Sequence, residues 1–204
     1  LQPQCLVANN HHHTPFPGED IQIFERDLPG ENKAGLSGQS IGRLPLESCQ
    51  TINEHWGYNI TDTNYKSPKE LIQMLVRAAG KNANLLLNIG PEPGGALPSL
   101  ALDRLQAIGK WLNKYGETIY GTRGGIVAPH DWGVSTQRGN KLYIHILNCM
   151  DSSLFIPTGN HKIKSATVFG TNKRVNFTKT GNGITLNLDT IPTDIDYIVE
   201  LTLG

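Results

Sequence analysis

The alternation of strand and helix patterns between residues 47 and 116 constrains the fold of this chain most strongly. Residues 84–91 contain a short apolar run that ends in a Gly-Pro turn, as a buried strand does, and residues 47–53 are a further candidate strand. The helical pattern 67–80 between them opens with Ser-Pro-Lys-Glu, which combines a capping box with proline at the first helical position. A second helix pattern, 99–116, ends at a glycine. Strand, helix, strand and helix joined by short connections predict a parallel sheet.

The apolar run 5–8 precedes a long loop, residues 9–30. We expect a buried strand at 5–8, so that Cys5 and Cys49 are buried, inert thiols in core strands. Prolines stiffen the loop, which contains three histidines and four carboxyl groups, those of Glu19, Asp20, Glu25 and Asp27. Loops that leave the carboxyl ends of parallel strands carry the functional groups of α/β proteins. The loop 9–30 is therefore the first place to look for a functional site.

From residue 134 onward the pattern changes to short runs with a period of two, and no helical pattern intervenes. The runs are 141–147, 154–156, 166–169, 175–177, 184–188 and 197–201. Turn residues separate them, and residues 180–183, Thr-Gly-Asn-Gly, are typical of a β-hairpin. These features predict a small all-β antiparallel sandwich as a second domain, in which His145 is a half-buried structural residue.

Composition excludes several classes of partner. Lys plus Arg and Asp plus Glu both number 18, so nothing steers the chain toward nucleic acid or an anionic membrane. No apolar run approaches the roughly 20 residues that span a bilayer. Three cysteines do not indicate a disulfide framework, and the sequons at Asn59 and Asn176 do not fix the compartment. Because the chain starts at Leu1 and enters a core-type strand at once, we expect it to be the C-terminal portion of a longer protein.

Four stretches of the chain together resemble the retaining α-L-fucosidases of glycoside hydrolase family 29. They are NNH…PFPGED…FERDLPG, CQTINEHWGYN, LLLNIGPEPGG and IGKWLNKYGETIYGT, which cover most of residues 5–123. The resemblance implies that residues 1–123 are the C-terminal part of a (β/α)8-like TIM barrel and that residues 124–204 are the β-sandwich domain that follows it. It also implies hydrolysis of terminal α-L-fucosyl linkages with retention and without a cofactor. The GED…IFERDLPG form resembles the branch that acts on α1,3- and α1,4-linked fucose in Lewis-type glycans.

The resemblance assigns Glu25 as the general acid/base, five positions after Asp20, with Glu19 and Asp20 as competitors in the same loop. A retaining glycosidase needs a second carboxyl group about 5–5.5 Å away as its nucleophile. In the family this group is an aspartate that follows a tryptophan, and no such Trp-x-Asp motif stands in this sequence. We therefore expect the nucleophile to lie upstream or on another polypeptide, and this chain alone to be inactive.

The resemblance also places Trp56 against the sugar, where an indole face can stack on a pyranose and on the C6 methyl of fucose. We expect His11, His13 and Asp20 to bind sugar hydroxyls. A metal site is the alternative for the histidines. Only His11 and His13 can share a metal, since neighbours on an extended backbone point to opposite faces, and zinc would need a third ligand such as Glu19 or Asp20. Because the family works without a metal, we expect none.

The leading hypothesis is thus an exo-acting α-L-fucosidase whose partner is a fucosylated oligosaccharide or glycoconjugate. A catalytically incomplete fragment that acts as a carbohydrate-binding or structural module is the rival, and a metal-dependent hydrolase is a third possibility. An N-terminal polypeptide that completes the barrel is the expected protein partner. By resemblance we expect a secreted or periplasmic protein, or a lysosomal one in a eukaryote.

Overall fold

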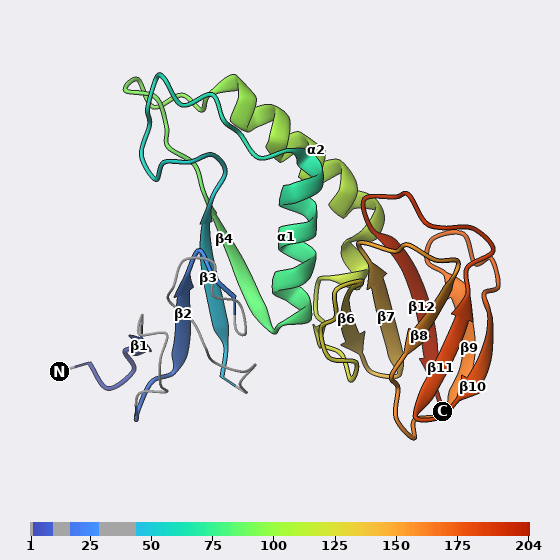
Figure 1. The fold of residues 1–204 in the computed structure, drawn as a ribbon. Helices are drawn as coiled ribbons and strands as arrows, with labels where there is room; N and C mark the ends of the chain where they lie inside the picture. The colour runs from blue at the N-terminus through green and yellow to red at the C-terminus, as the bar shows by residue number, and fades with distance from the viewer. Residues whose placement is uncertain (1, 10–16, 29–43) are drawn as a thin grey trace. The chain divides into compact units, whose positions relative to one another are not determined.

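The computed structural model describes residues 2–9, 17–28 and 44–204 (Figure 1). The chain divides into two compact units, Leu1–Lys110 and Trp111–Gly204. The division falls inside a helix, whereas the sequence places the domain boundary between residues 123 and 124, and that boundary stays a prediction.

The first unit contains a four-stranded parallel sheet in the order β1-β2-β3-β4. Its strands are β1 (Ala8–Asn9), β2 (Ile21–Glu25), β3 (Leu46–Thr51) and β4 (Ala83–Asn88). Helix α1 (Pro68–Gly80) follows β3 and helix α2 (Ser99–Tyr115) follows β4. The predicted parallel sheet with alternating helices is therefore confirmed. The ends of both helices lie within two residues of their predicted positions.

The start of α1 is stabilised by the hydrogen bonds that its sequence predicts. The Ser67 hydroxyl accepts a hydrogen bond from the Glu70 backbone N–H at 3.2 Å, and the Glu70 carboxylate accepts one from the Ser67 N–H at 2.7 Å. These bonds satisfy donors that a helix terminus otherwise leaves unpaired. The hydrogen bonds from Ser67 lower the pKa of Glu70, because they stabilise the charged carboxylate.

Helix α1 covers one face of the sheet and lies beside β4 in Figure 1. The core between them contains Phe24, Leu28, Leu46, Ala78 and Ala83. A second cluster joins α1 to the first turns of α2 and to the residue after β3, through Leu71, Ala101 and Ile52. This packing fixes the direction in which β2, β3 and β4 present their remaining side chains.

Two expectations for the N-terminal segment are wrong. The run 5–8 is exposed, Cys5 included, and only its last residue belongs to β1. In the described part of the chain β1 pairs on one side only, with β2, so it lacks the neighbours that would bury it. The loop 9–30 is also not continuous, since residues 21–25 form β2. Each face of the sequence IQIFE mixes apolar and polar residues, so no clear two-residue alternation of apolar and polar residues marks the strand.

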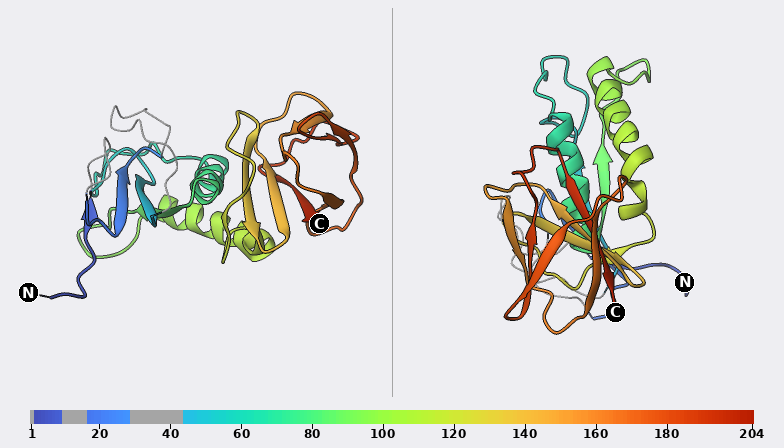
Figure 2. Two further views of the ribbon diagram at one scale, coloured as in Figure 1. Left: turned by 90° about the horizontal axis from the view of Figure 1, so that it is seen from below. Right: turned by 90° about the vertical axis from the view of Figure 1, so that its right-hand side faces the viewer.

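The second unit consists of antiparallel strands in two sheets, which can be followed from yellow to red in Figure 2. A short 3-10 helix, Gly116–Thr118, precedes them. The five-stranded sheet, in the order β5-β6-β7-β12-β9, contains β5 (Arg123–Gly124), β6 (Gly133–Arg138), β7 (Lys141–Ile146), β9 (Ile163–Val168) and β12 (Tyr197–Leu203). The three-stranded sheet, in the order β10-β11-β8, contains β8 (Ser153–Ile156), β10 (Asn176–Thr180) and β11 (Gly183–Asn187).

Both sheets contribute to one hydrophobic core, which includes Ile144 of β7, Leu201 of β12 and Leu186 of β11. The predicted hairpin is confirmed, since β10 and β11 form an antiparallel pair in which Thr180 lies opposite Gly183, next to the turn. The expectation for His145 is wrong in degree, because its side chain is 0% exposed rather than half-buried. Its strand lies inside the five-stranded sheet, where the packed neighbours cover it.

Candidate functional site

Glu25 is the last residue of β2 and stands at the carboxyl end of the parallel sheet. Phe24, the residue before it, is buried against α1. Because successive side chains of a strand point to opposite faces, Glu25 lies on the face of the sheet that α1 does not cover. The register aligns Glu25 with Cys49 of β3, and Cys49 with Leu86 of β4. Leu86 is 52% exposed, so this row of three residues lies on an open face of the described part of the chain.

Cys49 is an electrostatic neighbour of Glu25. The pKa of the Cys49 thiol is raised, chiefly by burial, then by the Glu25 carboxylate, with a smaller effect from Glu47. The thiol contacts the Phe24 carbonyl oxygen at 3.7 Å. A raised pKa keeps this thiol neutral at pH 7, so it does not provide an anionic nucleophile beside Glu25.

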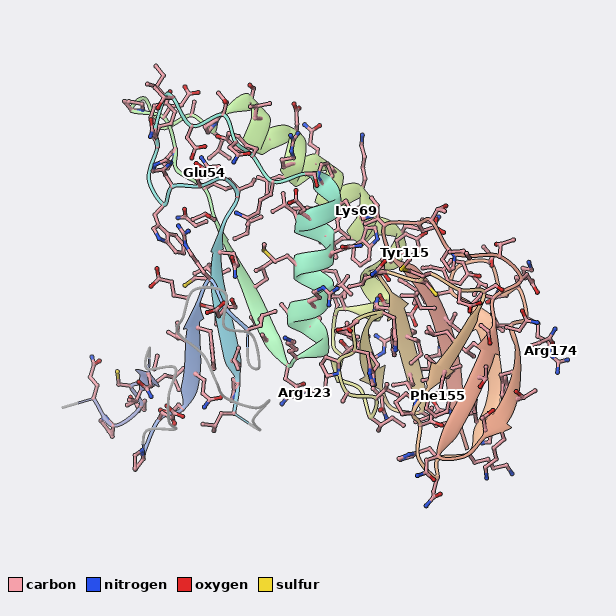
Figure 3. All side chains as sticks on the ribbon, viewed as in Figure 1. Glu54, Lys69, Tyr115, Arg123, Phe155 and Arg174 are labelled. Atoms are coloured by element: carbon pink, nitrogen blue, oxygen red, sulfur yellow. The ribbon has the colours of Figure 1, made fainter. Side chains whose placement is uncertain are left out.

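The loop that follows β3, residues 52–67, is organised by the buried carboxylate of Asp62. One of its oxygens accepts hydrogen bonds from the backbone N–H groups of Glu54 and His55, both at 3.1 Å, and lies 2.7 Å from His55 Nδ1. The other accepts from the Asn64 N–H at 3.2 Å. These bonds lower the pKa of Asp62, with the His55 side chain as the largest cause. The result is a fixed backbone immediately before Trp56. Figure 3 shows Glu54 in this loop.

Lys66 fixes the far end of the same loop. Its ammonium group donates hydrogen bonds to the carbonyl oxygens of Thr51 at 2.5 Å and Asn53 at 3.1 Å. The pKa of Lys66 is lowered, first by burial and then by the nearby positive charge of Arg26. The two ends of the loop are therefore tied to the end of β3.

Trp56 lies in this loop with 36% of its surface exposed. It borders an open hollow lined by residues 55–60, which include the half-exposed Tyr58. The Arg26 guanidinium carbon lies 5.2 Å from the centroid of the Trp56 ring, and Arg26 Nη2 donates a hydrogen bond to the Glu54 carbonyl oxygen at 3.0 Å. Glu25 and Trp56 are thus linked through the residue that follows Glu25.

Asp20 is not brought to the same end of the sheet. It precedes β2, whereas Glu25 ends it, and its carboxylate accepts a hydrogen bond from the Val7 backbone N–H at 2.8 Å. His11 and His13 lie outside the described residues, so their predicted roles remain predictions.

The competing carboxyl groups of the predicted loop are placed differently from Glu25. Glu19 is buried and accepts a hydrogen bond from the Gln22 side chain at 3.1 Å. Asp27 is fully buried, beyond the end of β2. Among the carboxyl groups of the described loop residues, Glu25 alone combines the carboxyl end of a strand with the open sheet face.

One group of possible metal ligands occurs among the described residues, formed by Glu54, His55 and Asp62, with ligand atoms within 4.8 Å of one another. Hydrogen bonds already occupy these atoms. Asp62 accepts from backbone donors and faces His55 Nδ1, while Glu54 Oε1 accepts from the Asn64 amide at 2.6 Å. The donor set fits a hydrogen-bonded loop better than a metal site.

Sequence reasoning missed Arg26, Asp62 and Lys66. Asp62 had a detectable signal, because the Asn, Thr and Asp residues at 59–64 are of the types that hydrogen-bond to nearby backbone. Arg26 and Lys66 had none, since their partners are distant in sequence.

The alpha-L-fucosidase family model matches residues 1–117. The chain belongs to the alpha-L-fucosidase family. An alpha-L-fucosidase of Dictyostelium discoideum is 30% identical to it over 173 residues, which are 76% of this chain and 38% of that protein. The plasma alpha-L-fucosidase of Homo sapiens is 35% identical over 107 residues, which are 48% of this chain and 22% of that protein.

Solved structures agree with this assignment. Alpha-L-fucosidase isoenzyme 1 from Paenibacillus thiaminolyticus has a TM-score of 0.80 at 33% identity, covering 100% of this chain and 51% of that chain. Thermotoga maritima alpha-fucosidase has a TM-score of 0.70 at 28% identity, covering 92% of this chain and 43% of that chain. The chain therefore spans about half, or less, of the length of these relatives. Among its described residues, no helix is both long and apolar enough to cross a membrane.

Proposed function

We propose that this chain supplies the general acid/base and part of the sugar-binding surface of a retaining exo-α-L-fucosidase. The observation that carries the proposal is the position of Glu25, at the carboxyl end of a parallel strand and on the open face of the sheet, in a chain of this family. Catalytic groups of (β/α)8 enzymes lie at that end of the strands. We take the parallel sheet as part of such a barrel, with the antiparallel unit as the domain that follows it.

The two carboxyl groups have complementary roles in the proposed reaction. An aspartate outside these 204 residues attacks the anomeric carbon while Glu25 gives its proton to the departing glycosidic oxygen. In the second step Glu25 takes a proton from water, whose oxygen displaces the aspartate and releases fucose with its configuration retained. The neutral Cys49 thiol beside Glu25 adds no charge to this site.

Trp56 is the proposed platform for the sugar ring. Its exposed indole, held by the loop that Asp62 organises, suits the apolar face of a pyranose. A fucosylated oligosaccharide or glycoconjugate, with α1,3- or α1,4-linked fucose as in Lewis-type glycans, is the proposed substrate. A secreted, periplasmic or lysosomal location suits such a substrate and is part of the same proposal.

The test compares two substrates in the active enzyme, meaning this chain together with the polypeptide that supplies the nucleophile. We expect Glu25→Gln to lower kcat/KM for a natural fucoside by about 10²- to 10⁴-fold, because a poor leaving group needs protonation. A fucoside with an activated aryl leaving group should lose much less in the first step. Glu47→Gln is the matched control, since Glu47 lies on the same face of β3 as Cys49. Equal kinetics of Glu25→Gln and wild type on both substrates would remove Glu25 from the mechanism.

A glycan-binding module without catalysis is the second candidate, favoured by the absence of a Trp-x-Asp motif from the sequence. Calorimetric titration of the purified chain with fucose distinguishes the two. Submillimolar binding by the chain alone, together with no activity when the upstream polypeptide is supplied, would favour the module.

A further inference from the structure

Arg26 occupies an unusual position directly after Glu25. Its backbone N–H donates a hydrogen bond to the Cys49 carbonyl oxygen at 2.9 Å, which extends the pairing of β2 and β3 one residue beyond Glu25. Its φ angle is 61°, in the left-handed region that residues with a Cβ atom rarely adopt. Such a conformation persists where surrounding contacts determine it, and it turns the Arg26 side chain away from the direction that a continued strand would give.

The Arg26 side chain reaches the loop after β3. Its guanidinium both donates to the Glu54 carbonyl oxygen and lies 5.2 Å from the centroid of the Trp56 ring, within the roughly 6 Å range of a cation–π contact. A planar guanidinium can make both contacts at once, because its N–H groups point outward within its plane and leave its faces free for an aromatic ring. One side chain therefore connects the residue beside Glu25 to the indole of Trp56.

We propose that Arg26 is a positioning residue that holds the Trp56 indole at a fixed place relative to Glu25. The inference rests on the function proposed above, in which the sugar stacks on Trp56 and Glu25 protonates its glycosidic oxygen. A half-exposed tryptophan that had to be ordered on binding would cost affinity, whereas one already held by Arg26 does not.

The rest of the loop has hydrogen bonds of its own, separate from those of Arg26. Asp62 holds the backbone before Trp56, and Lys66 holds the carbonyl groups of Thr51 and Asn53. Loss of the Arg26 side chain would leave these bonds in place. Its effect should therefore fall on the ring of Trp56 rather than on the folding of the loop.

A double-mutant cycle in the active enzyme tests this role. We expect Arg26→Met to raise KM for an aryl α-L-fucoside about 3- to 10-fold and to change kcat by less than about twofold, because ring positioning contributes to substrate and transition-state binding alike. In a Trp56→Leu background the same change should alter KM by less than about twofold, since the group through which Arg26 acts is gone. An Arg26→Met effect of equal size in both backgrounds would overturn the inference. So would a fall in kcat at unchanged KM.

Two further variants keep the test decisive. Glycine adopts a φ of 61° without strain, so Arg26→Gly removes the side chain even if Arg26→Met proves unstable, and it should raise KM to the same extent. Arg174→Met, an exposed arginine labelled in Figure 3, is the control and should leave KM unchanged. A Glu25→Gln variant that keeps the activity of the wild-type enzyme would refute the proposed function. If the wild-type enzyme is active and the effects of Arg26→Met and Trp56→Leu on KM are strictly additive, only the role of Arg26 is refuted.

Discussion

Glu25 and Cys49 face each other across β2 and β3 on the uncovered side of the sheet, and the carboxylate adds to burial in raising the pKa of the thiol. This pairing places Glu25 beside a neutral, half-buried group rather than beside a base or a metal ligand. It also gives a chemical reporter within the site, because the reactivity of a thiol depends on its thiolate fraction.

Removal of the Glu25 charge should make Cys49 more reactive. The carboxylate raises the pKa of Cys49, so Glu25→Gln lowers that pKa and increases the thiolate fraction at a given alkaline pH. Mass spectrometry of the peptide that contains Cys49 measures the alkylation rate between pH 7 and about pH 10. In Glu25→Gln the rise of this rate with pH should occur at lower pH than in wild type. Glu47→Gln is the control and should give a smaller shift, since Glu47 has a weaker effect on the thiol. An unchanged rate profile in Glu25→Gln would contradict the pairing.

The loop after β3 should loosen in acid through Asp62. Its pKa is lower in the folded state than the ordinary value of 3.8, so its contribution is complete above that value and is lost as pH falls through the lower folded pKa. Hydrogen exchange at the Glu54 and His55 amides should therefore accelerate in that acid range, beyond the ordinary pH dependence of exchange. Asp62→Asn should give fast exchange of both amides already at pH 7. Asp103→Asn, an exposed change on α2, should leave them protected.

The capping box of α1 should contribute measurably to the stability of the first unit. Ser67→Ala removes the hydroxyl that accepts from the Glu70 N–H, and we expect a loss of about 1 kcal/mol in the free energy of unfolding. Urea denaturation followed by circular dichroism measures the loss. Ser153→Ala, at the exposed start of β8, is the matched change and should stay within about 0.5 kcal/mol of wild type. Equal losses from the two changes would show that the cap is not stabilising.

The buried pair of His145 and Asp196 should stabilise the second unit. The Thr136 hydroxyl donates its single proton to the Thr118 carbonyl oxygen at 2.6 Å, so it accepts from His145 Nε2 at 3.0 Å. His145 Nδ1 lies 2.7 Å from the Asp196 carboxylate. Both ring nitrogens of His145 therefore have a partner within the second unit.

Breaking this pair should be costly. Neither side chain is exposed, so Asp196→Ala leaves a buried imidazole without its partner, and we expect a loss of about 3–5 kcal/mol in the free energy of unfolding. Thermal denaturation of the second unit measures the loss. Asp194→Ala, two residues away, should have a much smaller effect. A loss below about 1 kcal/mol for Asp196→Ala would contradict a stabilising role for the buried pair.

The elements that the sequence determined are those with local signals. Helix α1 has its capping box, α2 ends next to a glycine, and the hairpin of β10 and β11 has its Gly-Asn turn. Strand β4 has a run of apolar residues bounded by turn residues. Each signal depends on residues within about four positions of one another, so no knowledge of the remaining chain was needed.

Tertiary structure decided the rest. The segment 21–25 forms a strand by pairing with β1 on one side and β3 on the other, and its register in the sheet places Glu25 on the open face. Arg26 meets Trp56, and Asp62 holds Glu54 and His55, only after β2 and β3 lie side by side and the loop folds back. His145 is fully buried because neighbouring strands cover it. Contacts between distant residues depend on which elements pair, and local preferences do not encode that choice.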